Sequence, residues 1–247
     1  MAKQGGIGDN FYVAGYDLSG DIASLQDIGG GPGVLQTTGI NKSAMERIGG
    51  LRDGRMSFNS YFNPSSNQSH DRLGNLPTTD VILSYFRGTV LGTEAACLNA
   101  KQVDYNGNRA DNGAFSFNVS ALGNSYGLEW GKQLTAGKRT DTAATNGTGV
   151  DFGAATAFGL QAYLQVFAFT GTSVTVKLQE SSDNGAGDAW TDVTGGGFTA
   201  ATGITSQRIE TTRSLAVERY LRVVTTGVFS NAVFAVMVNK NPVSVVF

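Results

Sequence analysis

The chain has 247 residues, of which 40% are apolar and only 15% are charged, and its net charge is −2. This length is enough for one large domain or two modest ones, and the apolar content excludes an unfolded polyelectrolyte. The near-neutral charge gives no electrostatic basis for binding nucleic acid.

The first elements alternate strands with glycine-rich turns. Residues 11–18 (FYVAGYDL) and 34–40 are predicted strands, and residues 27–33 (DIGGGPG) between them are a predicted flexible loop. Ser43 and Glu46 have the spacing of a capping box, which predicts one or two helical turns before the next glycines.

Residues 55–62 (RMSFNSYF) alternate, with Met56 and Phe58 on one side, which is typical of a half-buried strand. A polar loop is expected at residues 63–69. A short helix at residues 71–76 is expected to end at the following proline.

Three more strands are predicted at residues 81–86, 95–105 and 114–121. The segment Asn106-Gly107-Asn108 predicts a hairpin turn, because Asn-Gly adopts positive φ at little cost. An extended element at residues 128–134 (LEWGKQL) closes this region.

Residues 137–157 contain few large apolar side chains and are interpreted as a linker. The predicted organisation is therefore a domain at residues 1–152, which includes this linker, and a second domain at residues 153–247.

The C-terminal region predicts an antiparallel sandwich of the jelly-roll or immunoglobulin-like type. Its apolar alternation is clear, its turns contain Gly, Asn and Asp, and no long amphipathic helix appears. The expected strands are residues 159–170, 174–178, 190–193, 207–210, 219–225 and 232–238. The fold class is all-β, with a sandwich or barrel first and a sandwich second.

No residue pattern indicates catalysis. Cys97 lies in an apolar strand and His70 in a polar loop, so a buried thiol and an exposed or capping histidine are favoured over a catalytic pair. The segment Gly123-Asn124-Ser125-Tyr126-Gly127 matches a nucleophile elbow, but neither a helix nor a histidine follows it. An enzyme is the least supported class of function.

No metal or cofactor is expected. Asp183, Asp188 and Asp192 frame a glycine-rich loop, yet no glutamate follows at the spacing of a calcium loop. The densest basic cluster is Lys132, Lys138 and Arg139, where an ordinary surface is favoured over nucleic-acid binding. With one cysteine an internal disulfide is excluded.

No apolar run approaches the ~18 residues of a membrane span, and the first residues lack the apolar segment of a signal peptide. The chain is therefore expected to fold in the cytoplasm without a membrane partner.

An ordered series of motifs resembles the major tail proteins of long-tailed actinobacteriophages. The motifs are FYVAGYDLSGDI, TGINKSAMERIGGLRDGRMSFNSYFNP, LPTTDVILSYFRGTVLG, AKQVDYNGNRADNGAFSFNVSA and GLEWGKQLTAG. The stretch from Phe158 to Pro242, with VTVKLQESSD, AWTDV and ERYLRVVTTG, is similar to the β-sandwich appended to such virion proteins.

The resemblance implies a structural protein, made in the host cytoplasm, that assembles with copies of itself into stacked and usually hexameric rings of a tail tube. The implied further partners are the tape measure and tail terminator proteins, and genomic DNA passes through the lumen without specific binding. No catalytic residue is implied.

Two polar segments are candidates for contacts between subunits. The candidate residues are Asp27, Gly30, Pro32, Asn63, Ser66 and Gln68. The C-terminal sandwich is expected on the outside of the tube, so that a chain truncated after residue 153 still assembles. Trp190 and Tyr163 are candidate contacts for a surface glycan, although ordinary packing is favoured for both.

Two other classes of function remain open. One is another virion component, either a capsid decoration protein or a baseplate protein. The other is a non-viral carbohydrate-binding module, which fits poorly with a chain that lacks a signal peptide.

Overall fold

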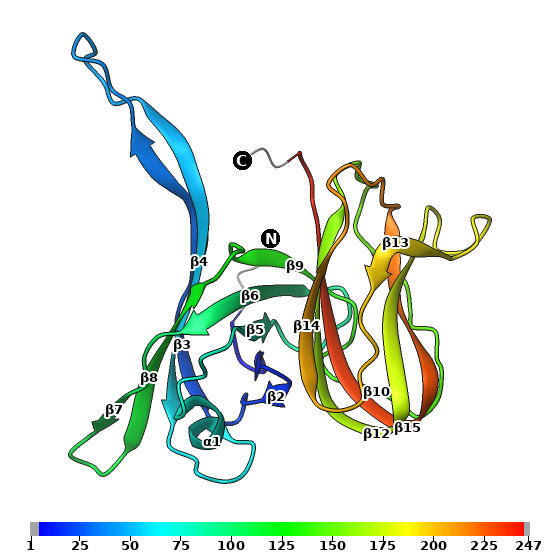
Figure 1. The fold of residues 1–247 in the computed structure, drawn as a ribbon, viewed down its shortest axis with the longest axis horizontal. Helices are drawn as coiled ribbons and strands as arrows, with labels where there is room; N and C mark the ends of the chain where they lie inside the picture. The colour runs from blue at the N-terminus through cyan, green and yellow to red at the C-terminus, as the bar shows by residue number, and fades with distance from the viewer. Residues whose placement is uncertain (1–4, 245–247) are drawn as a thin grey trace.

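The computed structural model describes residues 5–244 and joins 15 antiparallel strands in one continuous sheet, with a single short helix in the described chain (Figure 1). The all-β prediction is confirmed. The N-terminal half, residues 5–136, contains β1 (Asn10–Val13), β2 (Tyr16–Asp17), β3 (Ile22–Gln36), β4 (Arg47–Tyr61), α1 (Ser69–Leu73), β5 (Val81–Phe86), β6 (Glu94–Gln102), β7 (Asn106–Arg109), β8 (Phe115–Gly123) and β9 (Glu129–Gln133). The C-terminal half, residues 137–244, contains β10 (Arg139–Asp141), β11 (Val150–Asp151), β12 (Leu160–Ser181), β13 (Thr191–Gly197), β14 (Thr205–Glu210) and β15 (Tyr220–Lys240).

The N-terminal half buries its own apolar core between β3–β4–β8 and the strands β1, β5 and β6. Met56 and Phe58 of β4 share this core with Leu83 of β5 and Leu98 of β6, and all four side chains are 1% exposed or less. The predicted alternation of Met56 and Phe58 is therefore confirmed. Helix α1 begins two residues before its predicted range and adds Leu73 to this core.

Three local predictions in the N-terminal half are wrong. Residues 27–33 are not a loop but part of β3, which pairs with β4 along its whole length. Residues 43–46 do not form a helix but lie in the turn that joins these strands, where the Glu46 amide bonds to Thr38 Oγ1 at 3.0 Å. Residues 106–108 belong to β7, and the hairpin turn follows them, with the Gly113 amide donating to the Ala110 carbonyl. Glycine and asparagine here occupy extended positions, because cross-strand pairing outweighs their local turn preference.

Two very long strands build the C-terminal half. β12 and β15 pair from Leu160↔Lys240 to Ser181↔Tyr220, and their register shifts on either side of Gly171, which faces Phe229 at the middle of the ribbon. The predicted strands 159–170 and 174–178 are thus one strand, as are 219–225 and 232–238. Because Gly171 and Gly227 have positive φ, the ribbon bends there, and both of its ends contribute to one core.

The two halves share buried surface. β9 pairs with β6 of the N-terminal half and with β15 of the C-terminal half. A third apolar cluster lies between the halves and contains Tyr12, Ile82, Phe86, Ala95, Cys97, Tyr163, Ala235 and Met237. Segment 137–157, interpreted as a linker, contributes β10 and β11, which both pair with β15. The boundary at residue 152 stays a prediction.

Candidate assembly surfaces

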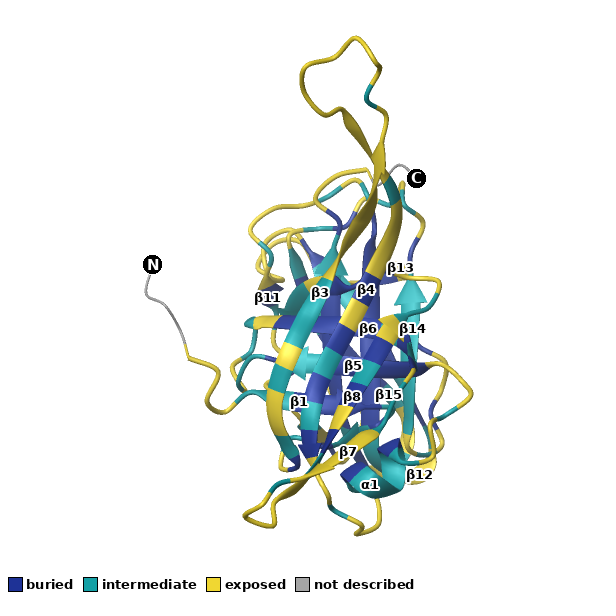
Figure 2. Cartoon of the chain, turned by 90° about the vertical axis from the view of Figure 1, so that its left-hand side faces the viewer, coloured by how far each residue is buried: buried dark blue, intermediate teal, exposed yellow. Residues whose placement is uncertain are grey.

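The largest projecting feature is the far end of the β3–β4 ribbon, which we call the arm (residues 32–52). β4 pairs with β8 only from Arg55 to Tyr61, so the ribbon leaves the body beyond Arg55 (Figure 1). Pro32 pairs with Arg52, and Gln36 pairs with Arg47 at the turn. In Figure 2 the arm stands clear of the body and is exposed almost throughout. Neither strand of the arm has a second partner within the described chain.

The arm carries large apolar side chains that nothing in the described chain covers. Leu35 and Ile48 are directly opposite each other and therefore lie on one face of the ribbon, while Val34 lies on the other face. The exposed apolar residues are Val34 (67%), Leu35 (53%), Ile40 (108%), Met45 (56%), Ile48 (55%) and Leu51 (87%). Apolar residues on both faces of an unsupported ribbon mark an interaction site.

The arm is also positively charged. It contains three basic residues and one acidic residue, Lys42, Arg47, Arg52 and Glu46, which gives a net charge of +2. Since the whole chain has a net charge of −2, the rest of the chain carries −4. The arm and the rest of the chain therefore differ in the sign of their net charge, which favours attraction between copies over repulsion.

Two opposed glycines form the root of the arm. Gly30 pairs with Gly54. A Cβ at Gly54 would lie 2.5 Å from the Leu128 amide nitrogen and 2.6 Å from Leu98 Cδ1, and one at Gly30 would lie 2.9 Å from Leu128 Cβ. Glycine is needed here because the ribbon crosses the body at very short range, and this contact fixes the direction in which the arm leaves.

The structure places three of the predicted contact residues on this ribbon. Asp27 forms an ion pair with Arg55 across the strands, so its carboxylate already has a partner in its own chain. Gly30 lies at the root, and Pro32 is exposed at the start of the arm. Of these three residues only Pro32 therefore lies in the arm, and the role of all three in contacts between subunits stays a prediction.

The other three predicted contact residues lie in a loop that is bonded to the body. Asn63 donates to Asp21 Oδ1 at 2.9 Å, and its carbonyl accepts the His70 amide at 3.0 Å. The Gln68 carbonyl accepts the Arg72 amide at the start of α1. Ser66 is exposed between them. These bonds make the loop a fixed part of the surface.

An exposed aromatic group, which we call the end patch (Phe62, His70 and Phe115), lies beside this loop. The Phe62 ring centroid is 4.6 Å from that of His70 and 5.2 Å from that of Phe115. Phe62 and Phe115 are each 40% exposed, and the nearly buried Phe117 packs beneath Phe115 at 4.8 Å. The end patch was not predicted, because its members come from three separate segments.

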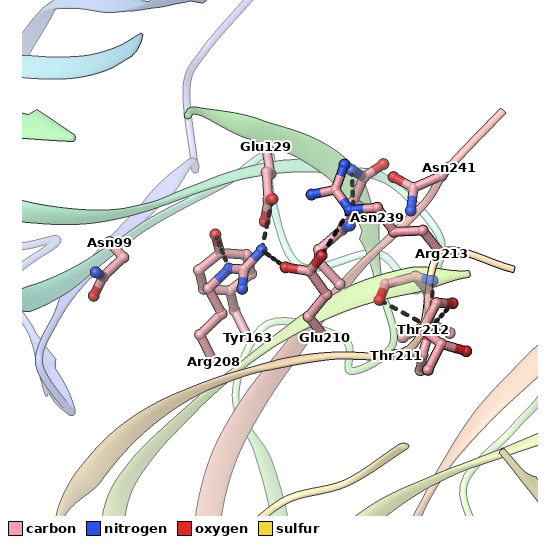
Figure 3. Close-up of polar contacts among 12 residues, drawn as sticks. Asn99, Glu129, Tyr163, Arg208, Glu210, Thr211, Thr212, Arg213, Asn239 and Asn241 are labelled. Atoms are coloured by element: carbon pink, nitrogen blue, oxygen red, sulfur yellow. Dashed lines mark hydrogen bonds and ion pairs between the residues drawn. The ribbon is translucent and has the colours of Figure 1, made fainter. Parts of the chain in front are cut away.

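A buried ionic cluster joins the two halves (Figure 3). Arg208 of β14 donates 2.9 Å hydrogen bonds to Glu129 of β9 and to Glu210, and its Nε donates to the Tyr163 hydroxyl at 3.0 Å. The Arg208 and Glu129 side chains are 7% and 6% exposed. The guanidinium also lies 3.6 Å from the centre of the Tyr126 ring. None of these residues was singled out from the sequence for this role, since single charges on separate strands form no local motif.

Two members of the cluster, Arg208 and Tyr163, have shifted pKa values. Burial lowers the pKa of Arg208, but the hydrogen bond and charge of Glu129 outweigh it and leave that pKa above its usual value. Burial, reinforced by the Glu129 carboxylate, raises the pKa of Tyr163 well above its usual range. Arg208 therefore stays charged and Tyr163 neutral, and the cluster acts as a structural clamp.

The two candidate glycan contacts differ in exposure. Tyr163 is 1% exposed, so it offers no surface to a sugar, in agreement with the ordinary packing that was favoured for it. It packs between the halves, where the sequence could not place it. Trp190 is partly exposed, but Arg222 lies 4.6 Å from its ring centre and the chain at Gly185 approaches its indole closely. A role for Trp190 in glycan binding stays a prediction.

The remaining candidate groups have local partners. Cys97 is fully buried with its Sγ 3.2 Å from Ser84 Oγ, and burial raises the pKa of its thiol, while His70 pairs with the Tyr105 hydroxyl. Asp183 accepts amides of its own loop. Within residues 5–244 no group of three or more His, Cys, Asp or Glu side chains is arranged to bind a metal. No helix in that range is both long and apolar enough to cross a membrane.

No protein-family model and no curated protein matches the chain. Three solved structures align with 94% of it. The first is the Dit protein of phage SPP1, described as a paradigm of the hub adsorption apparatus in phages that infect Gram-positive bacteria; it is 13% identical, with a TM-score of 0.34 and 99% of that chain covered. The second is the phage p2 baseplate in its activated conformation with Sr, at 11% identity, a TM-score of 0.32 and 98% coverage of that chain. The third is the same baseplate with Ca, at 12% identity, a TM-score of 0.31 and 98% coverage. Likenesses with TM-scores this low assign neither a fold family nor a function to this chain.

Proposed function

We propose that this chain is a structural subunit of a phage tail that assembles with copies of itself. The observation that carries the proposal is the arm, a two-stranded ribbon with exposed apolar residues on both faces. An isolated two-stranded hairpin is at best marginally stable in water. Its apolar residues therefore need a protein surface, and long exposed strands are a liability unless they are used for association.

The tail tube is the first candidate location, because the motifs given above resemble tail tube proteins. In this location each copy contacts its neighbours in a ring, and rings stack around the lumen through which DNA passes. The tape measure and tail terminator proteins are then the expected partners. A heterologous interface that closes by rotation forms a ring, and one that does not close extends along an axis.

The hub or baseplate of the tail is the second candidate location. The three aligned structures are a phage hub protein and a phage baseplate in two forms, and a hub or baseplate subunit needs the same self-association. The two locations differ in the expected product, since a tube subunit forms stacks of indefinite length and a hub subunit forms a single ring or a short stack.

Negative-stain microscopy and light scattering of the purified chain over a range of concentrations test the proposal. Long tubes would support the tube, and discrete rings the hub. The double variant Leu35→Ser/Ile48→Ser should reduce assembly, while Val228→Ser, a change of an even more exposed apolar residue outside the arm, should not. A chain that stays monomeric at high concentration would contradict the proposal.

A further inference from the structure

We infer that the arm of one copy docks on the end patch of a second copy, an inference that rests on the proposed self-assembly. The two surfaces lie at opposite ends of the N-terminal half. β4 begins in the arm at Arg47 and ends at Tyr61, beside the end patch. Figures 1 and 2 both place the arm at one end of this half and α1 and β7 at the other.

The arm cannot reach the end patch of its own chain. The strand from Ile48 in the arm to Tyr61 beside the end patch spans on the order of 40 Å, at ~3.3 Å per residue. β4 is paired on both sides from Arg55 to Tyr61, and Gly54 and Gly30 lie close against Leu128, so the arm is directed away from the end patch of its own chain. Any contact between the two surfaces is therefore a contact between two molecules.

The two surfaces match in chemistry. The arm presents aliphatic side chains, with Leu35 and Ile48 together on one face, and the end patch presents the exposed rings of Phe62 and Phe115. Aromatic rings contribute a large apolar area to an interface, and they attract the cations that the arm also carries. The second copy is favoured over another protein because the arm is positive and the rest of the same chain is negative.

The arrangement also determines the kind of assembly. An arm that binds the opposite end of the next copy makes a heterologous contact, which leaves one free arm and one free patch at the ends of every stack. The contact therefore propagates along the axis. Lateral closure of a ring has to use other edges.

Disulfide trapping between two single-cysteine variants tests the inference. The native Cys97 is fully buried, so it should not form cross-links. We mix Leu35→Cys with Phe115→Cys, and in a parallel sample Leu35→Cys with Val228→Cys, whose cysteine is exposed on the C-terminal half. Each mixture is oxidised mildly under assembly conditions, and cross-linked dimers are measured on non-reducing gels.

The inference predicts a dimer yield on the order of tenfold higher for the Phe115→Cys mixture, because docking gives the paired thiols a high effective concentration. Tyr61→Cys, at an exposed site next to the patch, replaces Phe115→Cys if that variant is unstable. Assemblies that form normally but give equal yields in both mixtures would overturn the docking and leave the proposed function standing. Failure of the parent chain, with Leu35 unchanged, to assemble under the same conditions would overturn both.

Discussion

The Gly15 amide donates a 2.6 Å hydrogen bond to Gln165 Oε1, although the two residues are 150 positions apart. The Gln165 amide nitrogen donates to the Ile82 carbonyl at 3.0 Å and to Ser84 Oγ at 2.9 Å. This one side chain of β12 thus satisfies three buried polar groups of the N-terminal half.

Replacing this glutamine should destabilise the whole chain. Gln165→Leu leaves the Gly15 amide buried without this partner and removes one of two hydrogen bonds to the Ile82 carbonyl, which still accepts the Ala14 amide, at roughly 1–3 kcal/mol in total. Gln26→Leu, at an exposed glutamine of β3, is the matched control and should change stability little. Urea unfolding measures both, and equal midpoints would contradict the bonding described.

A chain truncated after residue 153 should not form tubes. The sequence alone favours an independent N-terminal domain, but truncation exposes the apolar residues between the halves and removes β15 from β9. The fragment should therefore be aggregated or loosely packed. Its soluble fraction and near-ultraviolet circular dichroism provide the measurement, and a soluble, cooperatively folded fragment would show that the halves are separable.

Substitutions of Arg208 and Glu129, the buried ion pair, should have strongly non-additive effects on the free energy of unfolding. Arg208→Met leaves the Glu129 carboxylate buried without its cation and should cost about 3–5 kcal/mol. Adding Glu129→Gln removes that charge, so the double variant should recover part of the loss. A double-mutant cycle from chemical denaturation gives the coupling energy, and additive effects would rule out a clamp at this position.

The root of the arm should tolerate no side chain. Gly54→Ala brings a Cβ within 2.6 Å of Leu98 Cδ1 and should destabilise by about 1–3 kcal/mol. Gly197→Ala in β13 is the matched control, because a Cβ there meets nothing within 4 Å. Thermal unfolding compares them, and a neutral Gly54→Ala would mean that the ribbon shifts freely over the body.

The free energy of unfolding should increase in mild alkali because of the lowered pKa of Lys240. Burial lowers the pKa of this amine to about 8, despite the nearby Glu180 and Glu218 carboxylates. Between this value and the ordinary lysine pKa of about 10.4, the unfolded chain binds more protons than the folded one, so the free energy of unfolding increases with pH. Below the folded-state pKa of about 8 this contribution is constant.

The Lys240→Met variant isolates this effect. Its free energy of unfolding should lack the rise that the parent chain shows between about pH 8 and about pH 10. Urea titrations at several values of pH give both profiles. Parallel profiles would show that Lys240 is not responsible.

Local periodicity predicted the strands that face a core within one half. Leu160 and Leu164 alternate along β12 and are fully buried, as expected. The opposite face of β12 reads as polar or mixed, yet Tyr163 and Gln165 are equally buried, because the N-terminal half covers them. A sequence pattern reports the period of a strand but not which surface lies against its second face.

Glycines account for the other errors. The glycine run at Gly30 predicts a loop, whereas its pairing with Gly54 shows that two strands cross the body closely at this point. Gly171 predicts the end of a strand, although it bends one that continues. A glycine indicates that the backbone needs unusual freedom or close approach at that position. Only the pairing with distant strands determines whether it forms a loop, a bend or a crossing. For the same reason the buried cluster around Arg208 left no signal in the sequence.

The pairing pattern also bears on the order of events during synthesis. β3 and β4 are neighbours in sequence, joined by residues 37–46, so the ribbon that bears the arm can close soon after it leaves the ribosome. In contrast, β9 must wait for β15, about a hundred residues later. Nascent chains therefore expose the apolar arm before the rest of the fold is complete. Neighbouring chains on one messenger would have to stay apart during that interval for folding to precede association.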